Sequence, residues 1–228
     1  MADPNIHRLS LGQLFRTATP PPELSPVKVI AVHTTLDPLA EPEQADRWLS
    51  PEERHRPDTW RSSARRRHWF AGRIAARIAG EASGWTLSPT AMTVDARPSG
   101  SPVLRSWLGE LDLSITHSGD WALACTCPPG WWMGLDFEVG ADVRVHLSKR
   151  VCSAAQRTLH GLDPERGTQE RPGTFGAIWT IKEALLKAWR VGLVDPLDAI
   201  RVGRLPAELD GPVEVSPSDR SAFASVFF

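Results

Sequence analysis

The sequence predicts an α+β fold, and three observations lead to this prediction. Strand-like runs bounded by turn residues recur along the chain, as in "VKVIAVHTTL", "LDLSITHSGD" and "WALACTC". Long helical segments are inserted between these runs instead of alternating with them regularly. The chain has 228 residues, of which 41% are hydrophobic, so it can bury the core of one large domain or of two small lobes.

The predicted elements follow in chain order. Residues 1–26 end in the proline-rich "TATPPPELSP" and are predicted to be an arm or linker. A first lobe is expected over 27–130 and a second over 131–228. The predicted strands cover 27–36, 111–115, 121–127, 131–139, 198–203, 213–216 and 222–228, with a turn at "RPSGSP". The predicted helices cover 147–160 and the segment that contains 179–189.

A further helical region is predicted over 50–80. Ser50 is a candidate N-cap because Pro51 follows it and Glu53 stands three residues on. Pro57 is expected to break this region into two pieces, and Gly80 is expected to end it.

Composition excludes several classes of protein. No stretch approaches the roughly 20 apolar residues of a membrane helix, and the first residues form no secretory leader, so we expect a cytoplasmic protein without membrane association. The net charge of −1 argues against a nucleic-acid partner. Cys125 and Cys127 lie at strand spacing in an apolar run without other evident metal ligands, so we expect them to pack in the core.

A first functional signal is "WTIKEALLKAW", residues 179–189. Trp179, Glu183 and Lys187 are four residues apart, so they share one face of a helix. The pattern is compatible with a simple ion pair between Glu183 and Lys187. It is also compatible with a site that uses both charges.

A second signal is "GLDFEVG", in which Asp136 and Glu138 are two residues apart in a predicted strand. Their carboxylates would project from the same side and repel each other. A solvated strand edge would screen this repulsion. Inside an otherwise apolar region, a hard divalent cation such as Mg²⁺ is the alternative, and Glu183 would supply a third carboxylate.

A third signal is "SITHSGDW". A strand is expected to end at Ile115, so that Thr116, His117 and Ser118 present hydroxyls, an imidazole and backbone amides at one turn. Such a turn can hold an anion, although it is also an ordinary polar turn.

In this order, "SITHSGDW", "GLDFE" and "WTIKEALLKA" followed by "GLVDPLDAIRV" resemble the 4'-phosphopantetheinyl transferases of the Sfp type. The resemblance covers residues 27–228, because "LSPEERHRPDTWRSSARRRHWFAGRIAAR" is similar to the first helical region of that family. It implies a monomer of two similarly folded α+β lobes related by pseudo-two-fold symmetry. Coenzyme A would bind between the lobes, and its phosphopantetheine would pass to a serine of an apo acyl or peptidyl carrier protein.

The resemblance also implies roles for particular residues. Asp136, Glu138 and Glu183 match magnesium ligands, with Mn²⁺ as a possible substitute. His117 matches a histidine that contacts the pyrophosphate of coenzyme A, and Thr116 replaces a serine that contacts the same cofactor. Lys187 matches a lysine that reaches the phosphates. Glu183, Lys187 and His117 are therefore the predicted catalytic residues.

Two positions depart from the pattern of the family. Ser101 replaces the lysine of a Gly-Lys-Pro turn, and Glu53 stands where a relative can have a basic residue. Both positions help to bind the 3'-phosphate of coenzyme A in the family. We therefore predict that Arg97, together with one or more of Arg56, Arg65 and Arg66, binds this phosphate.

Two other functions are compatible with the same motifs. A metal-dependent phosphohydrolase would direct water at a pyrophosphate with the same carboxylates. A non-catalytic nucleotide-binding module would bind the ligand without forming a product.

Overall fold

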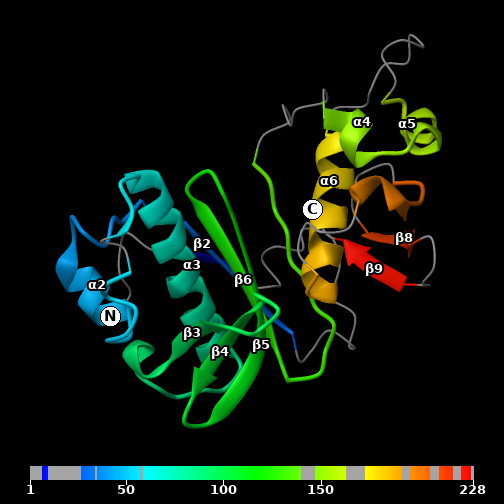
Figure 1. Cartoon of the computed structure of the whole chain (residues 1–228). Helices are drawn as coiled ribbons and strands as arrows, with labels where there is room; N and C mark the ends of the chain where they lie inside the picture. Colours follow the sequence, from blue (N-terminus) through cyan, green and yellow to red (C-terminus); the bar gives the residue numbers. More distant parts are fainter. Residues whose placement is uncertain are drawn as a thin grey trace. The chain divides into compact units, whose positions relative to one another are not determined.

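The structure is a computed structural model that describes residues 7–9, 27–33, 35–56, 59–139, 147–162, 173–191, 196–205, 211–217 and 222–226. It confirms the α+β class, since antiparallel sheets and helices make up the chain (Figure 1). The chain divides into two compact units, Met1–Phe137 and Glu138–Phe228, and each has its own hydrophobic core. In the described ranges, no helix combines the length and the apolar content needed to cross a membrane.

The first unit contains a six-stranded antiparallel sheet with the strand order β1-β2-β6-β5-β4-β3. Its strands are β1 (His7–Leu9), β2 (Lys28–His33), β3 (Thr93–Ala96), β4 (Pro102–Ser106), β5 (Gly109–Ser118) and β6 (Trp121–Cys127). The pairing of β1 with β2 shows that part of the predicted arm belongs to the sheet. The proline-rich stretch of that arm lies outside the described residues. Cys125 and Cys127 are buried and carry free thiols, as expected.

In the described part of this unit, two α-helices accompany the sheet, α2 (Pro42–Trp48) and α3 (Ser63–Ala82). The α3 helix begins after Ser62, whose side chain caps it by accepting a hydrogen bond from the Arg65 amide. The predicted helix start at Ser50 is therefore wrong, because residues 51–56 form turns. Pro57, the predicted break, lies outside the described residues.

The predicted helix stop at Gly80 is also wrong, because α3 continues to Ala82. A Cβ atom at Gly80 would lie 2.7 Å from Leu104 Cδ2 and 3.0 Å from Met92 Sδ. The glycine therefore lets these two side chains lie directly against the helix backbone. Its role is close packing instead of helix termination.

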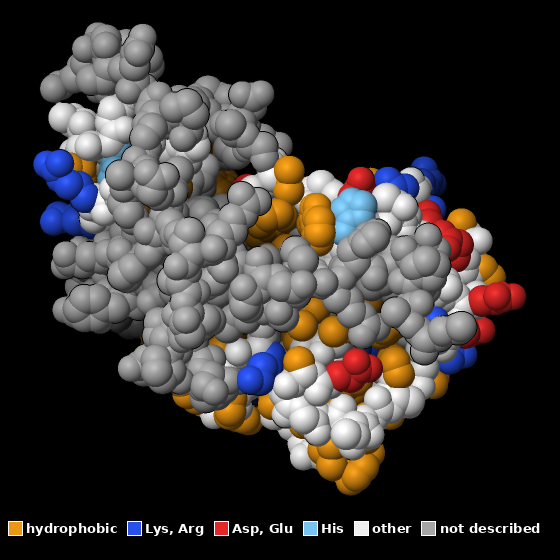
Figure 2. Space-filling model, turned by 180° about the vertical axis from the view of Figure 1, so that it is seen from behind, with side chains coloured by type: hydrophobic (Ala, Val, Ile, Leu, Met, Phe, Trp, Pro, Cys, Tyr) orange, Lys and Arg blue, Asp and Glu red, His pale blue; other side chains and the backbone are white. Residues whose placement is uncertain are grey.

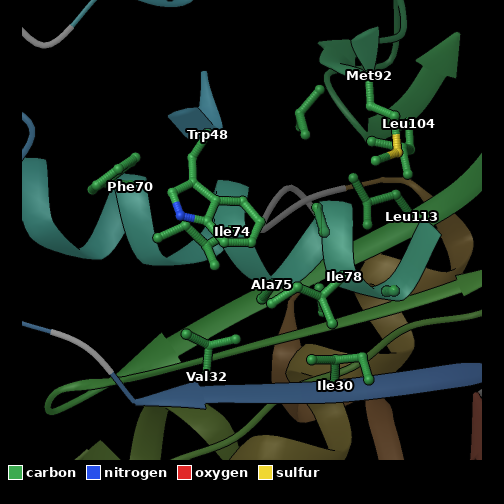
Figure 3. Packing of buried hydrophobic residues seen from close by; sticks show 14 of the residues in the cluster. Ile30, Val32, Trp48, Phe70, Ile74, Ala75, Ile78, Met92, Leu104 and Leu113 are labelled. Atoms are coloured by element: carbon green, nitrogen blue, oxygen red, sulfur yellow. The ribbon is translucent and has the colours of Figure 1, made fainter. Parts of the chain in front are cut away.

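The core of the first unit forms where α3 covers one face of the sheet. In Figure 3, Ile30 and Val32 of β2 face the α3 residues Ile74 and Ile78. Trp48, at the end of α2, packs into the same cluster and is 2% exposed. The burial of such large side chains is the main stabilising contribution in this unit.

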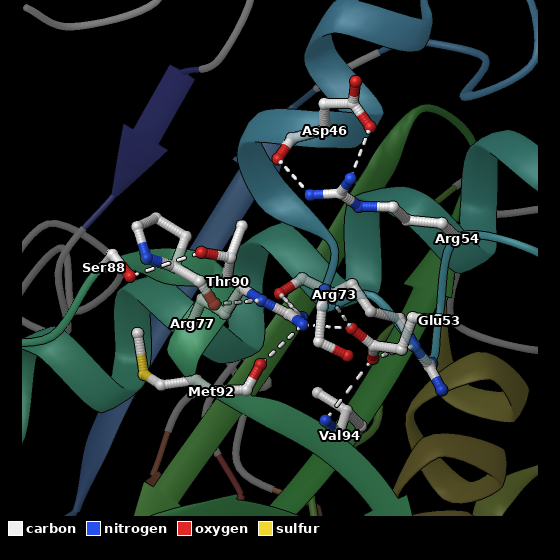
Figure 4. A network of polar contacts seen from close by, with 11 residues as sticks. Asp46, Glu53, Arg54, Arg73, Arg77, Ser88, Thr90, Met92 and Val94 are labelled. Atoms are coloured by element: carbon white, nitrogen blue, oxygen red, sulfur yellow. Dashed lines mark hydrogen bonds and ion pairs between the residues drawn. The ribbon is translucent and has the colours of Figure 1, made fainter.

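A buried ion-pair network holds the segment before α3 (Figure 4). Arg77 is fully buried, and its Nη2 atom bonds to Glu53 Oε2 and, at 2.7 Å, to the Met92 carbonyl. Glu53 Oε2 also accepts a hydrogen bond from the Ser50 amide at 3.0 Å. The carboxylate that the sequence suggested for a helix N-terminus is thus the partner of a buried arginine 24 residues away.

The second unit contains α4 (Ser148–Val151), α5 (Ala154–His160), α6 (Thr174–Trp189) and a three-stranded antiparallel sheet. The strands are β7 (Ile200–Val202), β8 (Gly211–Pro217) and β9 (Ala222–Val226), in the order β7-β8-β9. The predicted helix over 147–160 is divided in two, because Cys152 is extended and Ser153 caps α5 by accepting a bond from the Gln156 amide.

A buried lysine ties α6 to its surroundings. Lys182 is 0% exposed, and its Nζ atom donates hydrogen bonds to Val151 O at 2.6 Å, Gln156 Oε1 at 2.8 Å and Leu197 O at 2.9 Å. These acceptors belong to α4, α5 and the helical turn Leu197–Ala199. Burial among neutral oxygens lowers the pKa of Lys182 to about 8.

Candidate functional site

The motif "SITHSGDW" forms the end of β5 and the turn that follows it. The strand continues to Ser118, with Thr116 opposite Leu123 and His117 opposite Ala122 in the ladder with β6. The predicted turn at Thr116 is therefore wrong, since the chain reverses only at Gly119 and Asp120. Gly119 has a φ of 59°, which permits a tight connection between the two strands.

The two faces of β5 have different partners. Leu113 and Ile115 belong to the core under α3, and a Cβ atom at Gly72 of α3 would lie 3.0 Å from Ile115 Cγ2. Side chains alternate along a strand, so the even-numbered residues point to the opposite face. This alternation directs Thr116 and His117 to opposite faces of the sheet.

The even-numbered face of β5 holds the segment that carries Asp136. Asp112, Ser114 and Thr116 are each at most 5% exposed. Asp112 Oδ2 accepts the Gly130 amide at 3.0 Å, and Ser114 Oγ accepts the Leu135 amide at 3.0 Å. Three polar side chains at strand spacing therefore form a row along which the following segment lies.

Asp136 is bound directly by the last member of this row. The Thr116 hydroxyl donates a hydrogen bond of 2.9 Å to Asp136 Oδ1. The predicted strand at 131–139 is not formed, and side chains of β5 hold this segment instead of a regular backbone ladder. The motifs "SITHSGDW" and "GLDFE" are thus joined in space. The alternation of "LDLSIT" was the signal in the sequence that could have identified Asp112 and Ser114.

His117 is exposed on the other face of β5, beside α3. Its ring stacks on that of His68, with ring centroids 4.7 Å apart and an angle of 20° between the planes. His68 Nε2 lies 2.7 Å from the carbonyl oxygen of Gly119. His68 was not among the predicted site residues, because His117, on which it stacks, is 49 positions away along the chain.

Two of the four predicted phosphate-binding arginines are held by carboxylates. Arg66 grips Asp37 with two nitrogens, Nε at 2.9 Å from Oδ1 and Nη2 at 2.7 Å from Oδ2. These bonds hold the pKa of Asp37 below its usual range. Arg97 bonds to Asp112 at 2.7 Å and to Glu110 at 3.2 Å. These carboxylates neutralise the two guanidinium groups and occupy several of their N–H donors.

Two arginines of this region, Arg65 and Arg73, lie over a pair of tryptophans. Arg56 and Arg65 are exposed, and the Arg65 guanidinium lies 5.0 Å from the ring centroid of Trp60. Trp60 packs edge-to-face against Trp69, and Arg73 lies 4.5 Å from the centroid of the Trp69 ring. This alternation of guanidinium and indole groups includes Arg73, which was not a predicted site residue.

Arg73 shares a carboxylate with a second arginine. Its Nε atom is 3.6 Å from Glu53 Oε1, while Glu53 also binds Arg77. Burial is the largest effect on Arg73 and lowers its pKa to about 10, although Glu53 opposes this shift. Two guanidinium groups on one carboxylate leave an excess of positive charge, which favours a nearby anion.

Figure 2 shows where the charged side chains of the described residues lie on one face of the molecule. On the face drawn in Figure 2, the Lys and Arg side chains of the described residues lie in several separate groups, and those at the upper right lie beside Asp and Glu side chains. The absence of a nucleic-acid partner stays a prediction from the net charge of −1.

The third motif forms α6 of the second unit. Glu183 and Lys187 are partly exposed and one helical turn apart, while Trp179 packs against the core of this unit. Phe175 lies 6.3 Å from Trp179 between ring centroids. The helix therefore packs Phe175 and Trp179 against the core and leaves Glu183 and Lys187 partly exposed, with Glu183 Oε1 buried.

The predicted magnesium ligands belong to different units. Asp136 is in the first unit, and Glu138 and Glu183 are in the second. Within either unit, the described residues contain no group of three His, Cys, Asp or Glu side chains placed to hold a metal ion. The donor set itself, three carboxylates, is of the kind that Mg²⁺ prefers. The magnesium site thus stays a prediction.

Comparison with known proteins finds a family similarity for part of the chain. Residues 133–211, about a third of the chain, match the model of the 4'-phosphopantetheinyl transferase superfamily. This match contains Asp136, Glu138, Glu183 and Lys187. It confirms the resemblance of this part of the chain to that superfamily, while the Sfp type within it stays a prediction.

Among solved structures, the chain is similar to holo-acyl-carrier-protein synthase of Helicobacter pylori in complex with coenzyme A. The two share 19% sequence identity, and the TM-score is 0.36. The similarity covers 44% of this chain and 97% of the other chain. No curated protein matches this chain.

Proposed function

We propose that this protein transfers the 4'-phosphopantetheine group of coenzyme A to a serine of apo carrier proteins and releases 3',5'-ADP. The superfamily match over residues 133–211 supports this proposal. Further support comes from the three motifs, which occur in the order described above. The carrier proteins would be acyl or peptidyl carrier domains of polyketide, nonribosomal peptide or fatty-acid synthases.

One observation carries the proposal furthest. The Thr116 hydroxyl binds the carboxylate of Asp136, so two motifs separated by 20 residues meet in the first unit. If this contact were only structural, any pair of hydrogen-bonding side chains could occupy the two positions. The pair found here consists of a residue proposed to contact coenzyme A and a residue proposed to bind its metal ion.

Mg²⁺ is the metal that the proposed reaction would use. Asp136, Glu138 and Glu183 would hold it, and when bound it would neutralise negative charge on the diphosphate of coenzyme A. Mn²⁺ would be an alternative with similar oxygen ligands.

The side chains of this protein would then assist a single substitution at phosphorus. The serine oxygen of the carrier forms a bond to the β-phosphorus, and the bond from that phosphorus to the bridging oxygen breaks. The electron pair of this bond leaves with 3',5'-ADP. His117 and Lys187 would stabilise the negative charge that develops on the phosphates, and Glu183 is our candidate for the group that accepts the serine proton.

The 3'-phosphate of coenzyme A needs a separate cationic site. Arg56 and Arg65 are the predicted residues that are exposed, and the indole-stacked Arg73 extends the same basic region. We therefore favour Arg56 and Arg65 over Arg66 and Arg97, whose guanidinium groups are engaged by carboxylates. Arg73 is paired with Glu53 and would add positive charge to this region without binding the phosphate directly.

Mass spectrometry of apo carrier proteins tests the proposal directly. Several carriers from different pathways are incubated with coenzyme A and Mg²⁺, and each is examined for the mass of an added phosphopantetheine group. Samples with a metal chelator and with the Asp136→Ala variant serve as controls. Modification that requires both metal and Asp136 supports the proposal.

The same experiment distinguishes the two other functions. Breakdown of coenzyme A in samples without a carrier would favour a phosphohydrolase. Binding of coenzyme A with no modified carrier and no breakdown product would favour a nucleotide-binding module.

The Sfp type, a monomeric state and a cytoplasmic location remain part of the proposal. The pseudo-two-fold relation of two lobes, 27–130 and 131–228, belongs to it as well. Light scattering of the purified protein measures the oligomeric state, and activity toward carriers of secondary metabolism tests the assignment to the Sfp type.

A further inference from the structure

We propose that His68 is a positioning residue for coenzyme A binding, because its ring fixes the orientation of the His117 imidazole. This inference rests on the proposed function, in which His117 contacts the pyrophosphate. It adds a residue that lies outside all three sequence motifs.

The ring of His68 is itself held in place. Its backbone belongs to α3, and its Nε2 atom lies 2.7 Å from the carbonyl oxygen of Gly119. Because a carbonyl oxygen can only accept a hydrogen bond, Nε2 carries the hydrogen. The ring is therefore anchored at its Cβ by the helix and at its far edge by the turn after β5.

This anchored ring forms a platform for His117. The two rings are 4.7 Å apart between centroids and nearly parallel, at 20°. An exposed histidine on a strand otherwise samples several χ1 and χ2 rotamers. Stacking on a fixed ring restricts these rotamers before any ligand binds, so less conformational entropy is lost on binding.

The alternation of β5 explains why α3 supplies this platform. His117 points to the same face as Leu113 and Ile115, which is the face that α3 covers. The neighbouring Thr116 points to the other face and is held by Asp136. Each of the two residues proposed to contact the cofactor is thus oriented by a partner of its own.

A double-mutant cycle tests the inference. The dissociation constant of coenzyme A is measured by isothermal titration calorimetry for the wild type, His68→Ala, His117→Ala and the double variant. His68→Ala should weaken binding roughly 2- to 13-fold, the range expected for a stacked aromatic pair. In the His117→Ala background, the same change should have no further effect, because the ring that it positions is gone.

Two further variants separate positioning from general stability. His68→Phe keeps a stacked ring and should retain part of the affinity that His68→Ala loses. The matched control is His160→Ala in the second unit, which removes a ring nitrogen 3.1 Å from the Val202 carbonyl. That variant should leave the affinity for coenzyme A unchanged.

Proton NMR of the ligand-free protein reports the stack independently of any activity. The carbon-bound ring protons of His117 should show a ring-current shift that disappears in His68→Ala. A shift that does not change would overturn the inference, and so would additive losses of affinity in the cycle. If the wild type fails to bind coenzyme A, the proposed function and the positioning role are both wrong, although the ring-current shift should still be present.

Discussion

Replacement of Glu53 separates two roles for this residue: the missing phosphate-binding cation that the sequence suggests, and the buried ion-pair partner that the structure shows. If the position only lacked a cation for the 3'-phosphate, Glu53→Lys would strengthen the binding of coenzyme A. In the structure, Glu53 is 4% exposed and binds the fully buried Arg77, with Arg73 at 3.6 Å. A lysine would therefore be a third cation in a buried cluster, and we expect Glu53→Lys to be destabilised severely.

The neutral variant Glu53→Gln gives the magnitude. Removing one partner of a buried ion pair costs about 3 to 5 kcal/mol, because the other charge stays buried without compensation. For a chain of this size, that loss corresponds to a decrease in melting temperature of roughly 6 to 20 °C. The amides of Ser50 and Val94 also bond to this carboxylate, so the loss should lie toward the upper end.

Urea unfolding followed by tryptophan fluorescence measures this loss, since Trp48 and Trp85 lie in the core of the same unit. The matched control is Glu52→Gln, which changes an exposed neighbour and should alter the free energy of unfolding by no more than about 0.5 kcal/mol. A Glu53→Lys protein with wild-type stability and tighter coenzyme A binding would refute the reasoning.

Three further predictions concern the proposed site and its support. Asp136→Ala should abolish transfer with the fold intact. Thr116→Val should remove only one hydrogen bond and lower the free energy of unfolding by about 1 kcal/mol. Near-normal turnover of Asp136→Ala in the carrier assay would contradict the assignment of Asp136 as a metal ligand. In steady-state kinetics and Mg²⁺ titrations, Lys187→Ala should lower kcat more than Mg²⁺ affinity and Glu183→Gln should lower both, while equal and mild losses would favour a simple ion pair. The pKa of Lys182 falls from 10.5 to about 8 on folding, so the unfolded state binds more protons than the folded state between these pH values. The free energy of unfolding of the metal-free wild type, relative to that of Lys182→Met, should therefore rise with pH over this range. The total rise should be about 3 kcal/mol. Urea unfolding at several pH values checks this, and a constant difference would show that burial does not shift this pKa.

The sequence by itself determined the elements whose patterns are local. The β-branched run at β2, the apolar run at β6 and the helical spacing of α6 each depend on neighbours within a few positions. The order of the three motifs was also readable, because chemical identity and spacing do not depend on tertiary contacts. Residues 133–211 then matched the superfamily that these motifs resemble.

Only the tertiary structure decided which distant residues meet. A glutamate three positions after a serine indicates a helix N-terminus, yet residues 51–56 form turns, and Glu53 accepts the Ser50 amide and also binds Arg77, because a buried guanidinium requires a carboxylate. Gly80 looked like a helix end, yet the helix continues there because Leu104 and Met92 need the space of a missing side chain. Pairs such as these, and the stacking of His68 on His117, arise from the packing of α3 on the sheet, which local spacing in the sequence does not encode.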